Sequence, residues 1–373
     1  MGTKRRVPVR RGVKAAQPGA RDAFALIAAH GHEQVSYWYD PASGYRGIIA
    51  IHSTALGPAL GGTRFWNYAS DGEALVDVLR LSRGMTYKAA VAGLDLGGGK
   101  AVMLGDPSTR DREAIFRTHG RHVDSLGGRY LTAEDVGTSP ADMAYVVQET
   151  RHVTGLPGRS GDPSVLTAFG VFRAMHAGSR FVWGRDGLAG KTVAVQGLGH
   201  VGYGLCELLH RDGAKLVVSD VDAGRVQRAV AALGARAVAA DAIYAVPADV
   251  FAPCALGAVI NDATLGVLRV ALVCGAANNV LADDRHGDLL ERRGIAYVPD
   301  YVANAGGIIS IYQEVAGWTA ERSHAKADAI YDTVLRVLTI ARDERIPSYR
   351  AADRLAQQRL AAAEKAKGLP HRV

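Results

Sequence analysis

The sequence predicts an α/β fold of two domains, the second of which contains a doubly wound parallel sheet. The chain has 373 residues, which is too long for one ordinary hydrophobic core. Turn residues gather in GLPGRSGDPS, residues 155–164, as in a linker. After it, apolar segments alternate with helical ones, which is typical of a parallel sheet covered by helices. We expect one domain over residues 22–155, another over 156–329, and helices over 330–373 that pack on the first domain.

The first domain is expected to begin with two strands separated by a turn. These strands are HEQVSYWYD and YRGIIAIHST. A helix is then expected over SDGEALVDVLRLSRGM, which opens with Ser70 and Glu73 at the spacing of a capping box. Its apolar residues recur on one face, as required for packing on a sheet.

Two further elements are expected before the linker. GRYLTAEDVG predicts a short strand that runs into a loop, and Ser139 is the expected N-cap of a helix in SPADMAYVVQET. Beyond the linker, helices alternate with the expected strands KTVAVQG, AKLVVSD, ARAVAA, ADVFAPC, VLRVALVCGA and GIAYVPD. From about residue 320 onward only helical patterns follow.

The charge of the chain is unevenly distributed. Lysine and arginine outnumber aspartate and glutamate by 44 to 37, and the whole excess lies within residues 1–21. A short basic tail is usually disordered and solvated, so we expect no nucleic-acid partner for the folded body. Nucleic-acid contact by the tail and a targeting role are the alternatives for this segment.

Composition also bears on the compartment and on metal binding. No apolar run reaches the length needed to span a membrane. Cys206, Cys254 and Cys274 are odd in number and lie in apolar sequence, which favours reduced thiols in a cytoplasmic protein. The cysteines and histidines have no metal-ligand spacing, so no metal site is expected.

One segment predicts a dinucleotide site. KTVAVQGLGHVGYGLCELL has the spacing G-x-G-x-x-G between an apolar strand and a helix. There Gly197 permits a tight turn, Gly199 lets the backbone approach a pyrophosphate, and Gly202 lets helix and strand pack closely. The helix amino terminus favours the anion, as in a Rossmann-type domain. The candidate cofactor-binding residues of this loop are Gly197, Leu198, Gly199, His200, Val201 and Gly202.

The choice between NAD and NADP depends on Asp220, which ends the following strand. A carboxylate there accepts hydrogen bonds from the adenosine ribose and repels a 2′-phosphate. The next basic residue, Arg225, lies further along, so we expect NAD. His200 follows Gly199, and it either meets the pyrophosphate or points to solvent.

Two lysines, Lys88 and Lys100, flank a glycine-rich stretch. A phosphate-binding loop needs Ser or Thr after the lysine, but Ala101 follows Lys100, so that interpretation fails. The glycines are interpreted instead as flat backbone that leaves room for a small substrate. A tight turn would bring both ammonium groups to one pocket, where repulsion and burial lower a lysine pKa. One lysine would then suit proton transfer, with Asp135 as its partner. The second lysine would bind a carboxylate of the substrate. From spacing alone, two surface lysines are the alternative.

Eight motifs, from about residue 32 to about residue 315, occur in the order in which one known family carries them. They resemble the dehydrogenases that act on glutamate, leucine, phenylalanine or valine, and look most similar to the leucine and valine enzymes. The motifs are STALGPALGGTRFW, RGMTYKAA, LDLGGGKAV, TAEDVG, VQGLGHVG, FAPCALG, GAANNV and PDYVANAGGIISI.

The resemblance implies oxidative deamination of an L-amino acid to its 2-oxo acid and ammonia, with reduction of NAD. It makes Lys88 the expected binder of the substrate α-carboxylate and Lys100 the catalytic base, with Asp135 assisting proton transfer. It also implies a homo-oligomer formed through the first domain. Because the lysines and the nicotinamide are expected on opposite sides of a cleft between the domains, closure of that cleft should assemble the site and exclude water.

Four polar residues are expected near the nicotinamide or the substrate, namely Thr167, Asn278, Asn279 and Asn304. Asn278 and Asn279 are adjacent, so the choice between them stays open. A structural turn is the alternative for Asn304.

Substrate preference is expected to depend on an apolar pocket. Related glutamate enzymes carry a lysine where GPALGG has Leu60, beside Gly61. An apolar residue there leaves a substrate side-chain carboxylate unpaired, which disfavours glutamate. Ile308 and Ile311 match pocket positions of the family, with core packing as the alternative. We expect valine, leucine and isoleucine as substrates, with modest discrimination among them. The alternative is an aromatic substrate, phenylalanine or tryptophan.

Overall fold

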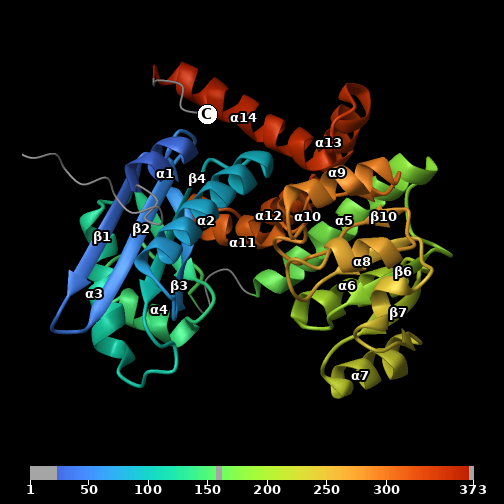
Figure 1. The fold of residues 1–373 in the computed structure, drawn as a ribbon, viewed down its shortest axis with the longest axis horizontal. Coiled ribbons are helices and arrows are strands. Elements are labelled where there is room, and N and C mark those ends of the chain that lie inside the picture. The colour runs from blue at the N-terminus through green and yellow to red at the C-terminus, as the bar shows by residue number, and fades with distance from the viewer. Residues whose placement is uncertain (1–22, 157–161, 369–373) are drawn as a thin grey trace, which may run out of the picture.

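The computed structural model describes residues 23–156 and 162–368, which form two α/β lobes (Figure 1). The predicted basic tail and the middle of the predicted linker lie outside the described residues. All three cysteines are free, as their sequence context predicts. No helix in the described ranges is both long and apolar enough to cross a membrane.

The first lobe is built on a five-stranded sheet in the order β1-β2-β4-β3-β5. Strands β4, β3 and β5 are parallel, whereas β2 is antiparallel to both of its neighbours. The elements of this lobe are α1 (Ala23–His30), β1 (Gln34–Asp40), β2 (Tyr45–Ser53), β3 (Ala59–Trp66), α2 (Asp71–Val91), β4 (Gly97–Leu104), α3 (Arg112–Ser125), β5 (Tyr130–Glu134) and α4 (Pro140–Val146).

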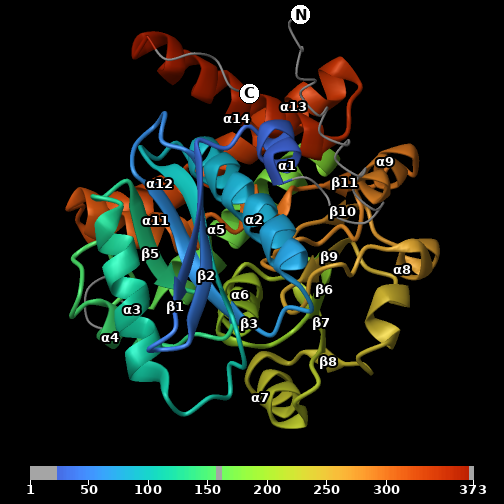
Figure 2. The same ribbon diagram turned by 60° about the vertical axis from the view of Figure 1, so that its left-hand side comes forward.

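Helices cover both faces of this sheet because the apolar residues of β2 alternate between them. Ile48 and Ala50 pack in one cluster with α2, as Figure 2 shows for the helix and its neighbouring strands. Ile49 and Ile51 pack in another cluster with Val123 of α3. A strand buried on both faces is almost entirely apolar, as YRGIIAIHS is.

Both predicted N-caps are present. The Ser70 side chain accepts a hydrogen bond from the Glu73 backbone at 3.2 Å, and Ser139 forms a reciprocal capping box at the start of α4. Helix α2 extends beyond its predicted end, to Val91, because nothing stops it before Gly93, whose φ is +67°. This extension places Lys88 in the last turn of α2.

The second lobe contains an all-parallel sheet in the order β11-β10-β9-β6-β7-β8. This is the doubly wound order, in which the winding reverses between β6 and β9, beside the glycine-rich loop. Its elements are α5 (Pro163–Trp183), β6 (Thr192–Gln196), α6 (His200–Arg211), β7 (Lys215–Ser219), α7 (Ala223–Leu233), β8 (Arg236–Ala237), a 3₁₀ turn (Ala242–Ala245), β9 (Val250–Pro253), α8 (Asp262–Val267), β10 (Leu272–Val273), α9 (Asp284–Arg292), β11 (Ala296–Tyr297) and α10 (Asp300–Ala303).

The last helices connect the lobes and differ in part from the prediction. They are α11 (Gly306–Ala316), α12 (Ala320–Asp328), α13 (Ile330–Glu344) and α14 (Ser348–Ala366). Helix α14 packs on α2 of the first lobe as expected, but α13 packs on α5 of the second lobe. Small residues of α5 allow this: a side chain at Gly170 would collide with Ile330. In both views α13 and α14 lie above the two lobes (Figures 1 and 2).

Candidate active site

The two lysines lie on adjacent elements of the first lobe, α2 and β4, joined by the turn at residues 92–96. The structure shows why glycines are needed before Lys100. A Cβ at Gly98 would lie 2.1 Å from the backbone nitrogen of Thr86, and one at Gly97 would lie 2.0 Å from the carbonyl oxygen of Ser53. Glycine is therefore needed at these positions because β4 lies directly against α2 and β2.

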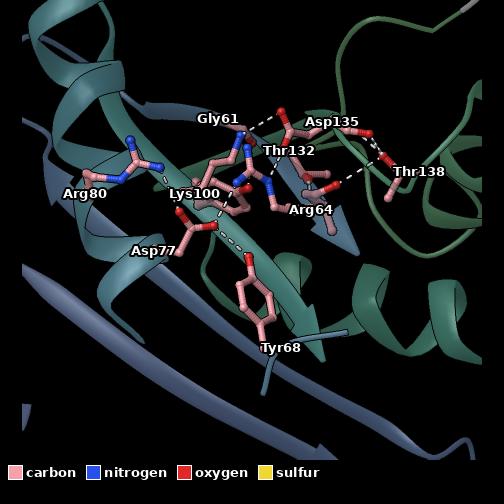
Figure 3. A network of polar contacts seen from close by, with 11 residues as sticks. Gly61, Arg64, Tyr68, Asp77, Arg80, Lys100, Thr132, Asp135 and Thr138 are labelled. Carbon is pink, nitrogen blue, oxygen red and sulfur yellow. Dashed lines mark hydrogen bonds and ion pairs between the residues drawn. The ribbon is translucent and has the colours of Figure 1, made fainter. Parts of the chain in front are cut away.

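Lys100 forms an ion pair with Asp135, at 3.0 Å between Nζ and Oδ1 (Figure 3). The lysine is 5% exposed, and burial lowers its pKa against the opposing charge of Asp135. Burial would raise the pKa of Asp135, but Lys100 and Arg64 outweigh it, so the carboxyl stays below its ordinary value and ionised. The predicted partners thus meet, as an ionised carboxylate beside a lysine whose pKa is lowered.

Lys88 contacts the second lobe. Its Nζ donates to Asn304 Oδ1 at 2.6 Å. Burial lowers the pKa of Lys88 to about 8, with a further lowering by Lys100 and an opposing effect of Asp300. The expected lowering of one lysine's pKa by the charge of the other is therefore present at Lys88.

Asn304 has a side-chain function rather than only a place in a turn. It is 3% exposed, and its Nδ2 donates to the Ala276 carbonyl at 3.0 Å and to Asn278 Oδ1 at 2.8 Å. The residue therefore connects Lys88 to the loop that follows β10. Sequence reasoning placed Asn304 near the cofactor, and its observed partners are protein groups on the lysine side.

Asn279 lies in the same loop and meets the first lobe through a different residue. Its Oδ1 accepts a hydrogen bond from Arg80 at 3.2 Å. Its φ is +52°, a backbone conformation that non-glycine residues seldom adopt and that asparagine tolerates best. Asn278 and Asn279 are both exposed, so each is accessible to a ligand.

The residues predicted to form the substrate pocket are apolar and mostly buried. Leu60 is 1% exposed and pairs in register with Gly98, two positions before Lys100. The Gly61 carbonyl accepts a hydrogen bond from the Tyr130 hydroxyl at 2.6 Å. Leu60 and Ile308 belong to one apolar cluster, against which the partly buried Ile311 packs. Their membership of that cluster supports core packing as much as substrate contact.

The nucleotide loop has the geometry that its glycines predict. Gly197 has φ +93°, which suits a tight turn, and a Cβ at Gly202 would lie 2.1 Å from the Gly197 carbonyl oxygen. A Cβ at Gly199, the N-cap of α6, would meet nothing within 4 Å, so this side of the loop is open. The open backbone at a helix amino terminus fits a dinucleotide pyrophosphate.

The other loop residues lie around this opening. Leu198 is buried and Val201 partly buried, while His200 is exposed to solvent. Thr167 on α5 is partly buried, and its hydroxyl donates to the Pro163 carbonyl at 2.7 Å. If Gly307 carried a Cβ, that atom would lie 3.2 Å from the Thr167 hydroxyl. Thr167 is thus next to the start of α11.

Asp220 already has backbone partners. Its carboxylate accepts hydrogen bonds from Leu198 N at 2.6 Å and Asp222 N at 2.8 Å. Arg225, which the sequence placed further along, has Nη1 only 3.9 Å from Asp220 Oδ2. The pair of charges stands where an adenosine ribose would lie in a Rossmann-type domain.

Sequence reasoning missed the charged residues behind Asp135. Arg64 Nε lies 3.0 Å from Asp135 Oδ2, and Arg64 Nη1 lies 2.8 Å from Asp77 (Figure 3). Asp77 also pairs with Arg80 at 2.9 Å. A cavity of about 1070 Å³ is lined in part by Arg64, Asp77 and Arg80, but by neither Lys88 nor Lys100. The one sequence signal was Arg64 within the motif GGTR, which was quoted but given no role.

Known proteins match this chain over most of its length. Residues 32–152 match the model of the Glu/Leu/Phe/Val dehydrogenase dimerisation domain, and residues 221–368 match that of Glutamate/Leucine/Phenylalanine/Valine dehydrogenase. The leucine dehydrogenase of Thermoactinomyces intermedius is 52% identical over 340 residues, which cover 90% of this chain and 93% of the relative. The valine dehydrogenase of Streptomyces coelicolor is 50% identical over 340 residues, with coverages of 89% and 93%.

A solved structure is similar over nearly the same length. The crystal structure of L-tryptophan dehydrogenase from Nostoc punctiforme superposes with a TM-score of 0.84 at 41% identity, covering 91% of this chain and 99% of that one. Matches of this extent and identity establish common descent and a common fold. The chain therefore belongs to the Glu/Leu/Phe/Val dehydrogenase family of amino-acid dehydrogenases.

Proposed function

We propose that the protein catalyses the NAD-dependent, reversible oxidative deamination of a branched-chain L-amino acid to its 2-oxo acid and ammonia. The observation that carries this proposal is the buried Lys100–Asp135 pair beside a second lysine of lowered pKa, Lys88. The leucine and valine dehydrogenases among the relatives support the branched-chain substrate.

Lys88 binds the substrate α-carboxylate. With a pKa of about 8 it is largely protonated near neutral pH, and a bound carboxylate stabilises the charged form further. Asn304 holds the ammonium from the second lobe, which fixes the direction in which Lys88 donates. The substrate Cα is thereby oriented before any proton moves.

Lys100 acts as the general base. Burial favours its neutral amine, which can accept a proton from the substrate ammonium and, later, from the water that attacks the imine. Asp135, 3.0 Å away and ionised, stabilises the ammonium that Lys100 becomes and can exchange its proton. Because the base must be neutral, activity should rise toward alkaline pH.

NAD, when bound, supplies the hydride acceptor for the substrate Cα. Residues 197–202 would hold its pyrophosphate at the amino terminus of α6, and the Asp220 carboxylate would receive the ribose hydroxyls. Thr167 and the exposed Asn278 and Asn279 are the proposed contacts at the nicotinamide end or the substrate.

Leu60, with Gly61, Ile308 and Ile311, is proposed to line the substrate side-chain pocket. Leu60 is almost fully buried, so a glutamate side chain would place an unpaired carboxylate against an apolar surface. An aromatic substrate is the second candidate, and the similarity to a solved tryptophan dehydrogenase favours considering it. A homo-oligomer is also proposed, since the first lobe matches a domain model described as a dimerisation domain.

The direct test is NADH formation at alkaline pH with valine, leucine, isoleucine, phenylalanine, tryptophan and glutamate. We expect turnover of the aliphatic substrates and its loss in Lys100→Ala, while NAD binding by that variant is retained. Turnover of the aromatic substrates above the aliphatic ones would move the assignment to the second candidate. A folded wild-type protein that binds NAD but oxidises none of the six would refute the proposed function.

A further inference from the structure

Arg64, on β3, is bound between two carboxylates next to Lys100 (Figure 3). Its Nε lies 3.0 Å from Asp135 Oδ2 and its Nη1 2.8 Å from Asp77 Oδ2. The side chain is only 21% exposed, so these interactions are screened less than those of a surface ion pair. Arg64 therefore acts on the same carboxylate that Lys100 uses.

The Asp135 carboxylate is divided between two cations. Oδ1 faces Lys100 Nζ and Oδ2 faces Arg64 Nε, each at 3.0 Å. An aspartate that served Lys100 alone would stabilise the ammonium form strongly. Because Arg64 takes the other oxygen and adds a positive charge, it favours the neutral amine of Lys100. This is the form that a base requires.

Asp77 acts in the opposite direction. It lies on α2, and its carboxylate accepts the Tyr68 hydroxyl at 2.7 Å and Arg80 Nη2 at 2.9 Å as well as Arg64. Its negative charge favours the ammonium form of Lys100. Asp77 thus holds Arg64 in place and offsets part of its charge.

The groups that surround Lys100 come from several elements. Those that are charged or titratable are Arg64 on β3, Asp77 and Lys88 on α2, Tyr130 on β5, and Asp135 after β5. Burial raises the pKa of Tyr130, so this residue is neutral throughout the working range. The variable charges are therefore the two lysines, and the fixed ones are Arg64, Asp77 and Asp135.

We propose that Arg64 is a positioning residue of the active site and that it sets the proton affinity of Lys100 by sharing the Asp135 carboxylate. Asp77 holds Arg64 in place and acts on Lys100 in the opposite direction. The inference rests on the proposed role of Lys100 as the base. It makes a signed prediction: loss of the Arg64 charge and loss of the Asp77 charge must change the titration of Lys100 in opposite directions. A merely structural role gives no such reversal.

The experiment compares Arg64→Gln and Asp77→Asn with the wild-type protein. Arg46→Gln is the matched control, because it breaks an exposed ion pair between Arg46 and Asp71, which lies on α2 as Asp77 does. Two readouts are taken across pH: the rate of trace acetylation of Lys100 by acetic anhydride, quantified by mass spectrometry, and kcat/KM. The first follows the Lys100 amine directly and requires no enzymatic activity. Thermal unfolding verifies that each variant is folded.

We expect Arg64→Gln to move the titration of Lys100, and the acid limb of kcat/KM, up by about one pH unit, and Asp77→Asn to move both down. Arg46→Gln should move neither. If one charge variant does not fold, the sign of the other shift still tests the inference. Equal or same-direction shifts of Lys100 in the two variants would overturn it. Opposite acetylation shifts in a protein that oxidises no amino acid would support the inference while the proposed function failed.

Discussion

Substitution by alanine should affect different properties at two glycines of the nucleotide loop: stability at Gly202 and NAD binding at Gly199. At Gly202 the new Cβ would lie 2.1 Å from the Gly197 carbonyl oxygen and 3.2 Å from the Cys254 Cβ. The carbonyl cannot retreat freely, because Gly197 holds a turn with φ +93°. At Gly199 the same carbon would meet nothing within 4 Å, and φ of −65° suits alanine.

The magnitudes follow from these contacts. Overpacking costs about 1–3 kcal/mol, and we expect about 3 kcal/mol of lost unfolding free energy for Gly202→Ala because the obstacle is backbone. Gly199→Ala loses a favourable N-cap residue but reduces the entropy of the unfolded chain, so its stability should stay within about 0.5 kcal/mol of wild type. Its methyl group occupies the space proposed for the pyrophosphate, and NAD affinity should fall at least about tenfold, or about 1.4 kcal/mol.

Urea unfolding and calorimetric titration with NAD measure the two effects separately. Gly199→Ala should have a wild-type unfolding midpoint and weakened NAD binding. If it binds NAD as the wild type does, this loop does not hold the pyrophosphate. If Gly202→Ala unfolds at the wild-type urea concentration, the packing argument for that glycine is wrong.

Three further predictions concern other parts of the chain. Asp220→Asn keeps an oxygen for the Leu198 N–H but removes the charge beside Arg225, so the ratio of NAD to NADP turnover should fall about tenfold or more, measured as kcat/KM for each cofactor. Leu60→Lys buries an unpaired ammonium and should lower kcat/KM for leucine about a hundredfold, whereas Leu60→Met should stay within tenfold; equal losses would remove Leu60 from the pocket. Burial lowers the pKa of His32 to about 3 and of His52 to about 4, below the ordinary value near 6.5, so stability is complete above about pH 6.5 and is lost as pH falls. Each of these two histidines should cost about 2 kcal/mol at pH 5 relative to pH 7, and urea unfolding of His52→Gln should show a pH dependence smaller than that of wild type by about this amount, because other buried histidines such as His119 still contribute.

The fold was predictable where local chemistry decides it. Ser70 and Ser139 cap helices because their hydroxyls accept orphan N–H groups within the same few residues. The alternation after the linker likewise determines a parallel sheet. The partner of α13 was not predictable, because an amphipathic pattern shows which face is apolar and not what covers it. The fit of Ile330 against Gly170 becomes visible only in three dimensions.

The site was predictable only in part, for a similar reason. Resemblance indicated Lys88, Lys100 and Asp135, and the structure confirms that the last two form a pair. Contacts between remote polar residues have no local pattern: Arg80 and Asn279 are 199 positions apart in the sequence. Their pairing depends on how the lobes meet, and a single sequence does not contain that information.

The turn between the lysines is held by the far end of the chain. Arg359 of α14 donates to the carbonyls of Ala90 and Leu94 at 3.1 and 2.7 Å, and to Asp95 at 2.9 Å. The last carbonyls of a helix lack partners within it, and a guanidinium can bind several at once. These carbonyls flank the connection from α2 to β4, so Arg359 binds the segment that joins Lys88 to Lys100. The C-terminal helix therefore supports the segment that joins the two lysines of the proposed active site.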